Sequence, residues 1–183
     1  MEKQNENRRV RMTKHLMKDA LLELLDRTEL TGISVTAVCE AADVNRSTFY
    51  HYYTCPADLL REIEQDALDR IPVPPPVLDQ QGEEQLLRAT TAFFDYVKEN
   101  ERIFRILFSE SVNSGFSSRL VDLLCAQYIP GVESAGGPIS SFVQRYIANG
   151  TVGMMREWVV SGFPIRSREI AELMYFLSRK ITG

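Results

Sequence analysis

Residues 33–53 of this 183-residue chain read ISVTAVCEAADVNRSTFYHYY, and this stretch decides the expected fold. Ser34 is a suitable N-cap for a helix over residues 35–42, which has apolar side chains at helical spacing. The Asp-Val-Asn triplet at 43–45 favours a short turn, because Asp and Asn tolerate left-handed backbone. A second helix is expected over residues 46–53. Two short helices joined by such a turn predict a helix-turn-helix.

Helical periodicity extends over most of the remaining chain, and no run alternates at period two for long enough to predict a strand. One helix is expected over residues 13–27, before the motif. Another is expected over 56–71, with Pro56 suited to its first position. Apolar spacing further predicts a helix ending near residue 100 and helices over 103–108, 120–128, 139–160 and 168–180. The expected fold class is therefore all-α, with about nine helices.

The run Pro72-Val73-Pro74-Pro75-Pro76 is the clearest boundary in the sequence. Proline removes a backbone donor and clashes with the preceding turn, so this run cannot be helical. We expect a stiff connector here between two helical modules.

Composition bounds the class of protein. The hydrophobic content of 44% and charged content of 25% are ordinary for a globular chain. No apolar run approaches the ~20 residues that a membrane helix needs, and the first residues lack the apolar segment of a signal peptide. We therefore expect a cytoplasmic protein with no membrane association.

Charge is unevenly distributed along the chain. The net charge is −4, but residues 1–18 carry six Lys or Arg against two Glu, a local +4, which leaves about −8 elsewhere. A basic N-terminal arm is compatible with phosphate contact. A solvated charged tail has the same composition, so charge alone does not decide between the two.

Metal and catalytic chemistry find little support. The chain has an odd number of cysteines, without CxxC spacing, at Cys39, Cys55 and Cys125. Two potential metal ligands lie four residues apart, at His51 and Cys55, but no third ligand is nearby in the sequence. The chain offers no glycine-rich phosphate loop and no nucleophile with a spaced base. We expect no metal site, no cofactor and no enzymatic activity.

In a helix-turn-helix the second helix enters the major groove and its first residues meet base edges. Those residues here are Arg46, Ser47 and Thr48. An arginine can donate a bidentate pair to guanine, while serine and threonine can address bases or phosphates. Aromatic residues over 49–53 are more often core than surface, but four in five positions of a short helix cannot all point inward.

The segment 33–53 resembles the signature of the TetR family of transcription regulators. Its most specific part is Ser-Thr-Phe-Tyr-His-Tyr-Tyr at 47–53 after the Ala-Ala-Asp-Val-Asn turn, with Leu59-Leu60 following. The resemblance covers about residues 10–70, and the segment 149–158 is also similar. It implies a sequence-specific DNA-binding regulator, specifically a ligand-responsive dimeric repressor.

Carried over position by position, the resemblance places further residues at the DNA. It implies that Phe49 and Tyr53 are core residues that hold the recognition helix. The additional expected DNA contacts are Ser34, Thr36, Tyr50, His51 and Tyr52. Two positions depart from the family pattern. Pro56 stands where a phosphate-binding lysine is usual, which should weaken affinity, and Asp43 stands where glycine is common.

The resemblance also assigns roles to three regions. Residues 1–55 would be the helix-turn-helix DNA-binding domain, 56–77 a connecting helix with its proline-rich linker, and 78–183 a ligand-binding and dimerisation domain. A small-molecule effector site is expected among Phe94, Phe104, Phe108, Tyr128, Tyr146, Met154 and Trp158. For any single one of these residues, an ordinary packed core is the favoured explanation, because Met and aromatic residues at helical spacing are usually core.

The last two helices are expected to form the homodimer interface. Gly150 and Gly153 lie in mid-helix, where glycine is unfavourable, which suggests close approach of a neighbouring helix. Exposed faces of Met174, Phe176 and Leu177 would complete a four-helix contact around a two-fold axis. A two-fold dimer predicts a pseudo-palindromic operator in double-stranded DNA.

One alternative function stays open. A protein of the same fold can act as a coactivator or partner-binding protein that does not itself bind DNA. Pro56 permits this alternative, whereas the run from Arg46 to Tyr50 favours DNA binding. A DNA-affinity test separates the two.

Overall fold

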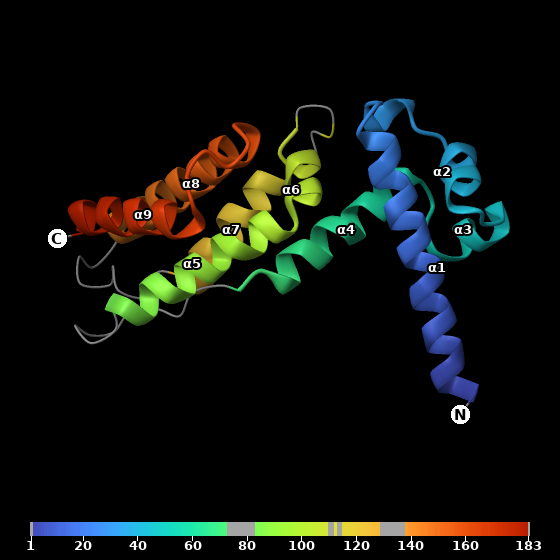
Figure 1. Cartoon of the computed structure of the whole chain (residues 1–183), viewed down its shortest axis with the longest axis horizontal. Helices are drawn as coiled ribbons and strands as arrows, with labels where there is room; N and C mark the ends of the chain where they lie inside the picture. The colour runs from blue at the N-terminus through green and yellow to red at the C-terminus, as the bar shows by residue number, and fades with distance from the viewer. Residues whose placement is uncertain (1, 73–82, 110–111, 113–114, 129–137, 183) are drawn as a thin grey trace. The chain divides into compact units, whose positions relative to one another are not determined.

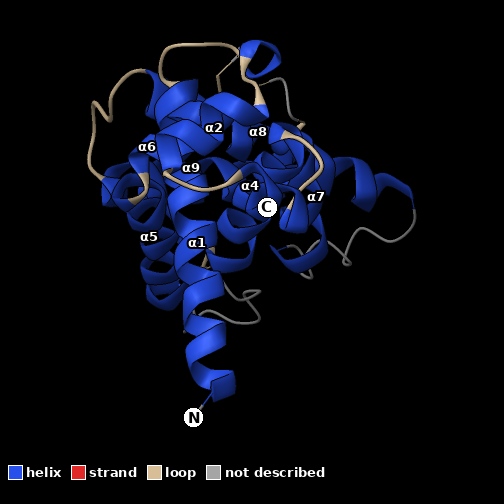
Figure 2. Ribbon diagram, turned by 90° about the vertical axis from the view of Figure 1, so that its right-hand side faces the viewer, coloured by secondary structure: helices blue, strands red, loops and turns tan. Residues whose placement is uncertain are grey.

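The computed structural model describes residues 2–72, 83–109, 112, 115–128 and 138–182. Within these residues the chain is entirely helical, with nine α-helices, one 3₁₀ turn and no strand (Figure 2). The helices are α1 (Glu2–Leu25), α2 (Val35–Ala42), α3 (Arg46–Tyr52), α4 (Pro56–Arg70), α5 (Glu83–Glu99), α6 (Glu101–Leu107), α7 (Phe116–Tyr128), α8 (Pro138–Val160) and α9 (Ser167–Thr182). The 3₁₀ turn, η1 (Leu30–Gly32), precedes α2. The all-α prediction is confirmed, and most of the proline-rich connector lies outside the described residues.

The first helix is longer than expected. α1 begins at Glu2, well before the predicted start at Thr13, and ends at Leu25. The added residues are rich in Glu, Lys, Gln and Arg, which have good intrinsic helix propensity. The sequence interpretation followed apolar periodicity, which begins only near Leu16, and so missed this part of the helix. Pro56 occupies the first position of α4, as predicted.

The chain divides into two compact units. Unit 1 comprises residues 1–67 together with 109–114, and unit 2 comprises residues 68–108 and 115–183. The boundary between Ala67 and Leu68 falls inside α4.

In unit 1, α1 packs against α2, and α2 packs against α3 (Figure 1). The core of this unit is mostly apolar, but it also contains Glu64, an acidic side chain that is fully buried. Its most deeply buried side chains include Met17, Leu21, Val38, Phe49, Leu59 and Leu60. Burying such side chains is the main force that holds these short helices together, because isolated helices of this length are marginal in water.

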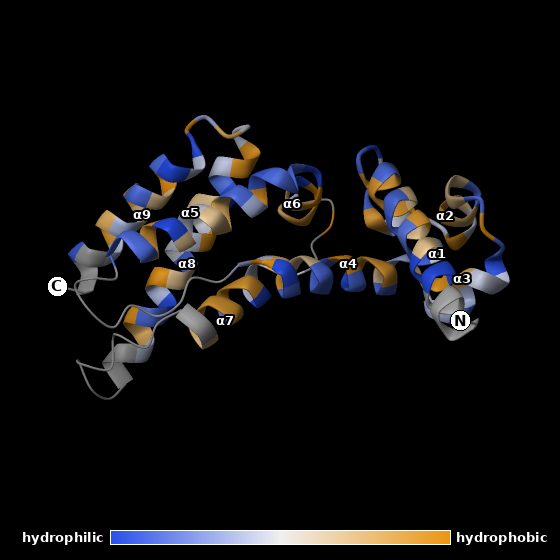
Figure 3. Cartoon of the chain, turned by 60° about the horizontal axis from the view of Figure 1, so that its bottom comes forward, coloured by the Kyte–Doolittle hydropathy of each residue, from blue (hydrophilic) through white to orange (hydrophobic). Residues whose placement is uncertain are grey.

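In unit 2, α5 packs along α9, α7 packs along α8, and α8 also contacts α6 and α9. The helices carry apolar and polar residues on different faces, as the mixed colours along α5 and α9 illustrate (Figure 3). The inward faces contribute a core that includes Phe93, Phe94, Val97, Phe104, Leu120, Met155 and Val159. None of the described helices combines the length and the apolar character that crossing a lipid bilayer demands.

Candidate nucleic-acid interface

The turn between α2 and α3 is fixed by local hydrogen bonds. Ser34 caps α2, because its Oγ accepts a hydrogen bond from the Ala37 N–H at 3.1 Å. Asp43 ends α2 in the left-handed region, with φ 51° and ψ 46°. The Val44 N–H then donates to the Cys39 carbonyl at 3.0 Å, which reverses the chain before α3. Aspartate is one of the few residues other than glycine that adopts this backbone readily.

The helix α3 separates its side chains onto two faces. Phe49 is fully buried, and Tyr53, at the helix end, is also buried with its ring centroid 5.6 Å from that of Phe49. The opposite face exposes Arg46, Ser47, Tyr50 and His51. The Tyr50 side chain is 60% exposed and meets Phe49 only edge-on. Two buried aromatic anchors therefore hold a short helix whose other face is polar and open.

The remaining predicted contacts lie around this face. Thr48 and Tyr52 are half-buried at its edges. Thr36 on α2 and Arg46 line one surface hollow together with Glu40 and Asp43. Ser34 is exposed, but its hydroxyl oxygen already accepts the capping hydrogen bond.

The charge around the start of α3 is mixed. Burial raises the pKa of the Cys39 thiol, and the positive charge of nearby Arg46 partly opposes that rise. Arg46 itself is exposed and shares the hollow with the acidic side chains of Glu40 and Asp43. On α1, Arg8, Arg9 and Arg11 are also exposed. Exposed arginines can approach phosphates, whereas the two carboxylates would repel them.

Sequence reasoning missed an ionic cluster in unit 1, which we call the α1–α4 junction: Lys14, Lys18, Glu62 and Asp66. Lys14 Nζ lies 2.9 Å from Glu62 Oε2, and Lys18 Nζ lies 2.7 Å from Glu62 Oε1 and 2.6 Å from Asp66 Oδ2. In the sequence, each like-charged pair is spaced four residues apart, so each lies on one helix face. No sequence signal couples positions 48 residues apart.

The junction lowers the pKa of Glu62, one of its two acidic residues. Burial acts to raise the pKa of Glu62, but the hydrogen bonds from Lys18 and Lys14 outweigh it and hold the pKa below its ordinary value of 4.5. Glu62 therefore stays ionised and paired at neutral pH.

In unit 2 the predicted effector residues separate into two aromatic groups. Phe94 and Trp158 meet edge-to-face, with ring centroids 5.4 Å apart. Phe104 and Phe108 form the second group with Phe116, a residue that sequence reasoning did not select. All five rings are buried. Edge-to-face aromatic contacts of this kind add about 0.5–1.5 kcal/mol per pair beyond area burial.

The other three predicted effector residues do not join these groups in the described structure. Tyr146 is 68% exposed on α8, and Met154 is half-buried. The side chain of Tyr128 lies outside the described residues.

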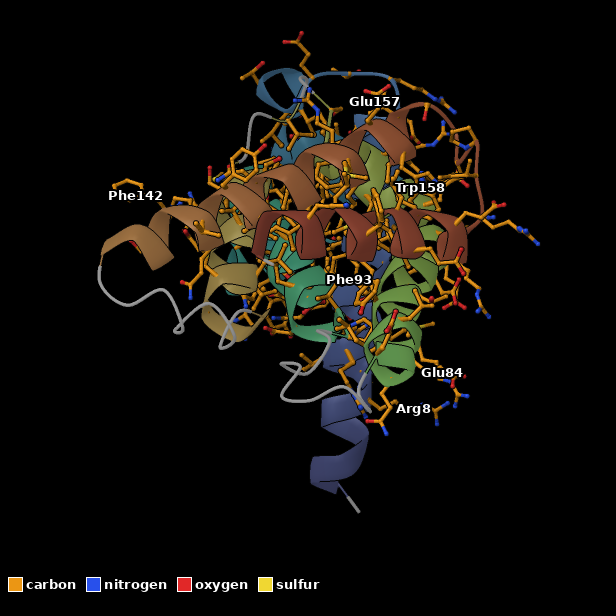
Figure 4. The ribbon with its side chains drawn as sticks, turned by 90° about the vertical axis from the view of Figure 1, so that its left-hand side faces the viewer. Arg8, Glu84, Phe93, Phe142, Glu157 and Trp158 are labelled. Atoms are coloured by element: carbon orange, nitrogen blue, oxygen red, sulfur yellow. The ribbon has the colours of Figure 1, made fainter. Side chains whose placement is uncertain are left out.

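One stripe on the exposed face of α8 is mostly apolar or lacks side chains, beside the exposed residues Arg145, Asn149 and Arg156, and α9 adds a second exposed apolar set. On α8, Phe142 is 76% exposed and projects away from the helix, whereas Trp158 points inward (Figure 4). The stripe consists of Phe142, Tyr146, Gly150, Gly153, Glu157 and Val160, and the exposed apolar residues of α9 are Leu173, Phe176 and Leu177. Met174, expected on this face, is buried, so that expectation was wrong. It lies between exposed Leu173 and half-buried Tyr175, on the side of α9 that packs into unit 2.

The two glycines of the stripe face open space. A Cβ atom added to Gly150 or Gly153 would meet no atom within 4 Å. Their smallness therefore serves no packing need within the described subunit. Among the described residues, no group of three or more His, Cys, Asp or Glu side chains is arranged to hold a metal ion.

Comparison with known proteins agrees with this architecture. A TetR-type family described as "Transcriptional regulator C-terminal region" matches residues 84–180. A search of curated protein sequences found no match. A TetR transcriptional regulator from Streptococcus agalactiae has a similar structure, with TM-score 0.72 and 18% identity over 96% of this chain and 98% of that one.

Of two other similar solved structures, one is described as an activator and the other as a repressor. The dihydroxyacetone kinase operon activator DhaS gives TM-score 0.64 and 18% identity over 93% of this chain and 96% of that chain. NalD, the secondary repressor of the MexAB-OprM multidrug efflux pump in Pseudomonas aeruginosa, gives TM-score 0.61 and 15% identity over 92% of this chain and 94% of that chain. At these identities the likeness establishes the fold alone. The family match spans more than half of the chain, so this protein belongs to the TetR family of transcriptional regulators.

Proposed function

We propose that this regulator binds a pseudo-palindromic operator as a homodimer, through unit 1, and represses transcription until a small-molecule effector lowers its affinity for the operator. The observation that carries the proposal is the division of α3 into a buried aromatic face and an exposed polar face. We further propose residues 1–55 as the DNA-binding domain, 56–77 as the connector and 78–183 as the sensing and dimerisation domain. No catalytic activity is proposed.

Each exposed residue of α3 has a proposed role. Arg46, at the first turn, would donate two hydrogen bonds to a guanine edge in the major groove. Ser47 and Thr48 would address neighbouring bases or phosphates, and Tyr50 would donate its hydroxyl to a phosphate. His51 and Tyr52 would approach the DNA backbone. Burial of Phe49 fixes the rotation of α3 about its axis, which is what keeps the polar face outward.

The exposed stripe of α8 and the apolar side chains of α9 support the proposed dimer. Exposed aromatic residues such as Phe142 and Phe176 are costly on a free surface. Gly150 and Gly153 have open space beside them, which a helix of a second copy would occupy. A two-fold axis would place the same stripe on both partners and present two copies of α3 to successive major grooves.

An effector would act by binding one conformation better than another, because equal affinity for both shifts nothing. The two buried aromatic groups of unit 2 favour an apolar ligand that inserts among the rings. Trp158 is the single tryptophan of the chain and touches both Phe94 and Phe163 edge-on. Its fluorescence therefore reports directly on ligand entry.

The experiment is selection of bound sequences from random duplex DNA, followed by titration of the selected operator at several salt concentrations. We expect enrichment of a two-fold-symmetric site. Arg46→Ala should relax the preference at one base per half-site and cost about 1–3 kcal/mol, and Tyr50→Phe should weaken all sequences uniformly. Arg27→Ala, which removes an exposed positive charge just beyond the end of α1, is the matched control.

The outcomes separate the candidate functions. Enrichment that Arg46→Ala alters and Arg27→Ala leaves intact supports direct readout by α3. Absence of any enriched site, with only weak salt-sensitive binding, would favour the partner-binding function that Pro56 permits. In that event, the next search is for a protein partner.

A further inference from the structure

The α1–α4 junction reaches the C-terminal end of α3 through one lysine. Lys14 Nζ lies 5.4 Å from the ring centroid of Tyr52 and 5.3 Å from that of Tyr53. Both distances are within the range of a cation–π interaction. Lys14 also lies 2.9 Å from Glu62 Oε2 on α4. The ammonium group of this α1 residue thus contacts both α4 and the end of α3.

Glu62 is the centre of this arrangement. Its Oε2 pairs with Lys14 and its Oε1 pairs with Lys18, so the carboxylate uses both oxygens. Only 16% of the Lys18 side chain is exposed, and 30% of each of the Lys14 and Glu62 side chains. An ion pair at this depth is less screened by solvent than a surface pair, and its hydrogen bonds demand a defined geometry.

Tyr53 lies beneath the junction. It is the C-cap of α3, and its N–H donates to the Phe49 carbonyl at 2.9 Å. Burial, and then the nearby Glu62 carboxylate, raise the pKa of the Tyr53 hydroxyl well above its ordinary value. The tyrosine therefore stays neutral, and Lys14 meets a neutral ring.

The charges of the junction cancel. Lys14 and Lys18 are balanced by Glu62 and Asp66, so the cluster adds no net positive charge toward DNA. In a protein that binds phosphates, two lysines held by carboxylates are withdrawn from the electrostatic attraction. What the junction supplies is geometry, because it holds the end of α3 against α1 and α4.

We propose that Glu62, through Lys14, is a positioning residue that fixes the orientation of α3 for DNA binding, although it does not itself contact DNA. The inference rests on the proposed DNA-binding function and adds to it the residue of α4 that sets the recognition helix. α4 is thereby connected to the end of α3 through the Glu62 carboxylate and the Lys14 ammonium group.

The test uses a variant for which electrostatics and loss of positioning change the affinity for DNA in opposite directions. Glu62→Gln removes one negative charge, and electrostatics alone would then raise affinity for DNA. Loss of positioning lowers affinity instead. We expect Glu62→Gln to weaken binding to the selected operator by about tenfold. The matched control, Glu23→Gln, removes the same charge from an exposed position of α1 and should bind as well as the unaltered protein, or slightly better.

A second measurement on the free protein separates this inference from the proposed function. Amide hydrogen exchange of Phe49 to Tyr53 should accelerate by about tenfold in Glu62→Gln, while amides of α2 and of unit 2 keep their rates. Asp66→Asn leaves both Glu62 contacts in place, so its effect should be smaller in both assays. Circular dichroism checks that each variant keeps its helical content.

Equal or tighter operator binding by Glu62→Gln would overturn the proposal. So would reduced affinity with unchanged exchange in α3, or an acceleration spread evenly over unit 1. If the unaltered protein binds no DNA sequence, the proposed function fails. The exchange pattern of Glu62→Gln then tests the positioning role without DNA. Acceleration confined to α3 supports that role, and any other pattern refutes it.

Discussion

Replacing Gly153 by alanine should affect the single subunit and the dimer with opposite signs. Gly153 lies in the middle of α8 on its exposed stripe, and a Cβ atom there would meet nothing within 4 Å. Glycine in a helix interior costs about 1 kcal/mol relative to alanine, chiefly through backbone entropy. For a subunit of this size, that gain corresponds to a rise in Tm of roughly 2–4 °C. The subunit should therefore become more stable.

The dimer should respond in the other direction. If a helix of the second copy packs against this position, an added methyl group meets it and overpacks the contact, at a cost of about 1–3 kcal/mol. Two-fold symmetry applies this cost to both partners. The dissociation constant of the dimer should then rise by at least about tenfold. Gly153→Leu adds a larger side chain at the same exposed position and should impair association further.

Sedimentation velocity over a concentration series measures the association, and urea unfolding of the dilute, monomeric protein measures the subunit. Ala126→Leu, which enlarges a small side chain at an exposed position of α7, is the control for a new surface leucine. Dimers of unchanged affinity in Gly153→Leu would refute the close helix approach. A subunit made less stable by Gly153→Ala would refute the argument from helix entropy.

Three further predictions concern individual contacts. Ser34→Ala should lower the free energy of unfolding by about 1 kcal/mol because the cap on the Ala37 N–H is lost; a drop in operator affinity at unchanged urea stability would instead indicate a DNA contact. Because the pKa of Glu62 is lowered, its contribution to stability is complete above its ordinary value of 4.5 and is lost as pH falls through the lower folded pKa. Glu62→Gln should therefore flatten the acid side of a Tm-against-pH curve, and parallel curves would contradict this assignment. Trp158→Phe removes the Nε1–H donor to the Ile165 carbonyl, 2.9 Å away, and part of a buried ring. It should lower the free energy of unfolding by about 2 kcal/mol, and an unchanged thermal transition would contradict both contributions.

Much of unit 1 could be predicted from residues near one another in the chain. Ser34 caps α2, Asp43 ends it in the left-handed region and Pro56 opens α4, each as local chemistry predicts. Phe49 is buried and Tyr50 is exposed, as the family resemblance implied. These outcomes follow from backbone preferences and from a spacing of about 3.6 residues per turn, which act over a few residues and are visible in the sequence.

The sequence did not predict which helix faces are covered by neighbouring helices. Tyr146 and Trp158 both lie on α8 and looked alike as candidates for an apolar site. They are separated by about 120° around the helix axis, and only tertiary packing, including the contacts with Phe94 and Phe163, makes Trp158 buried and leaves Tyr146 exposed. Met174 was misplaced for the same reason, because periodicity defines a face without identifying the element that covers it.

Local residue patterns predicted an all-helical chain and the position of the helix-turn-helix, because those properties arise from short-range backbone and side-chain preferences. The family resemblance added which residues of α3 are buried. The pairing of Lys14 with Glu62 and of Lys18 with Asp66, each across 48 residues, depends instead on how α1 packs beside α4. Tertiary structure alone likewise decided that Phe116 completes an aromatic group with Phe104 and Phe108. Such contacts form between distant segments once the core has set how helices pack, and no local preference encodes them.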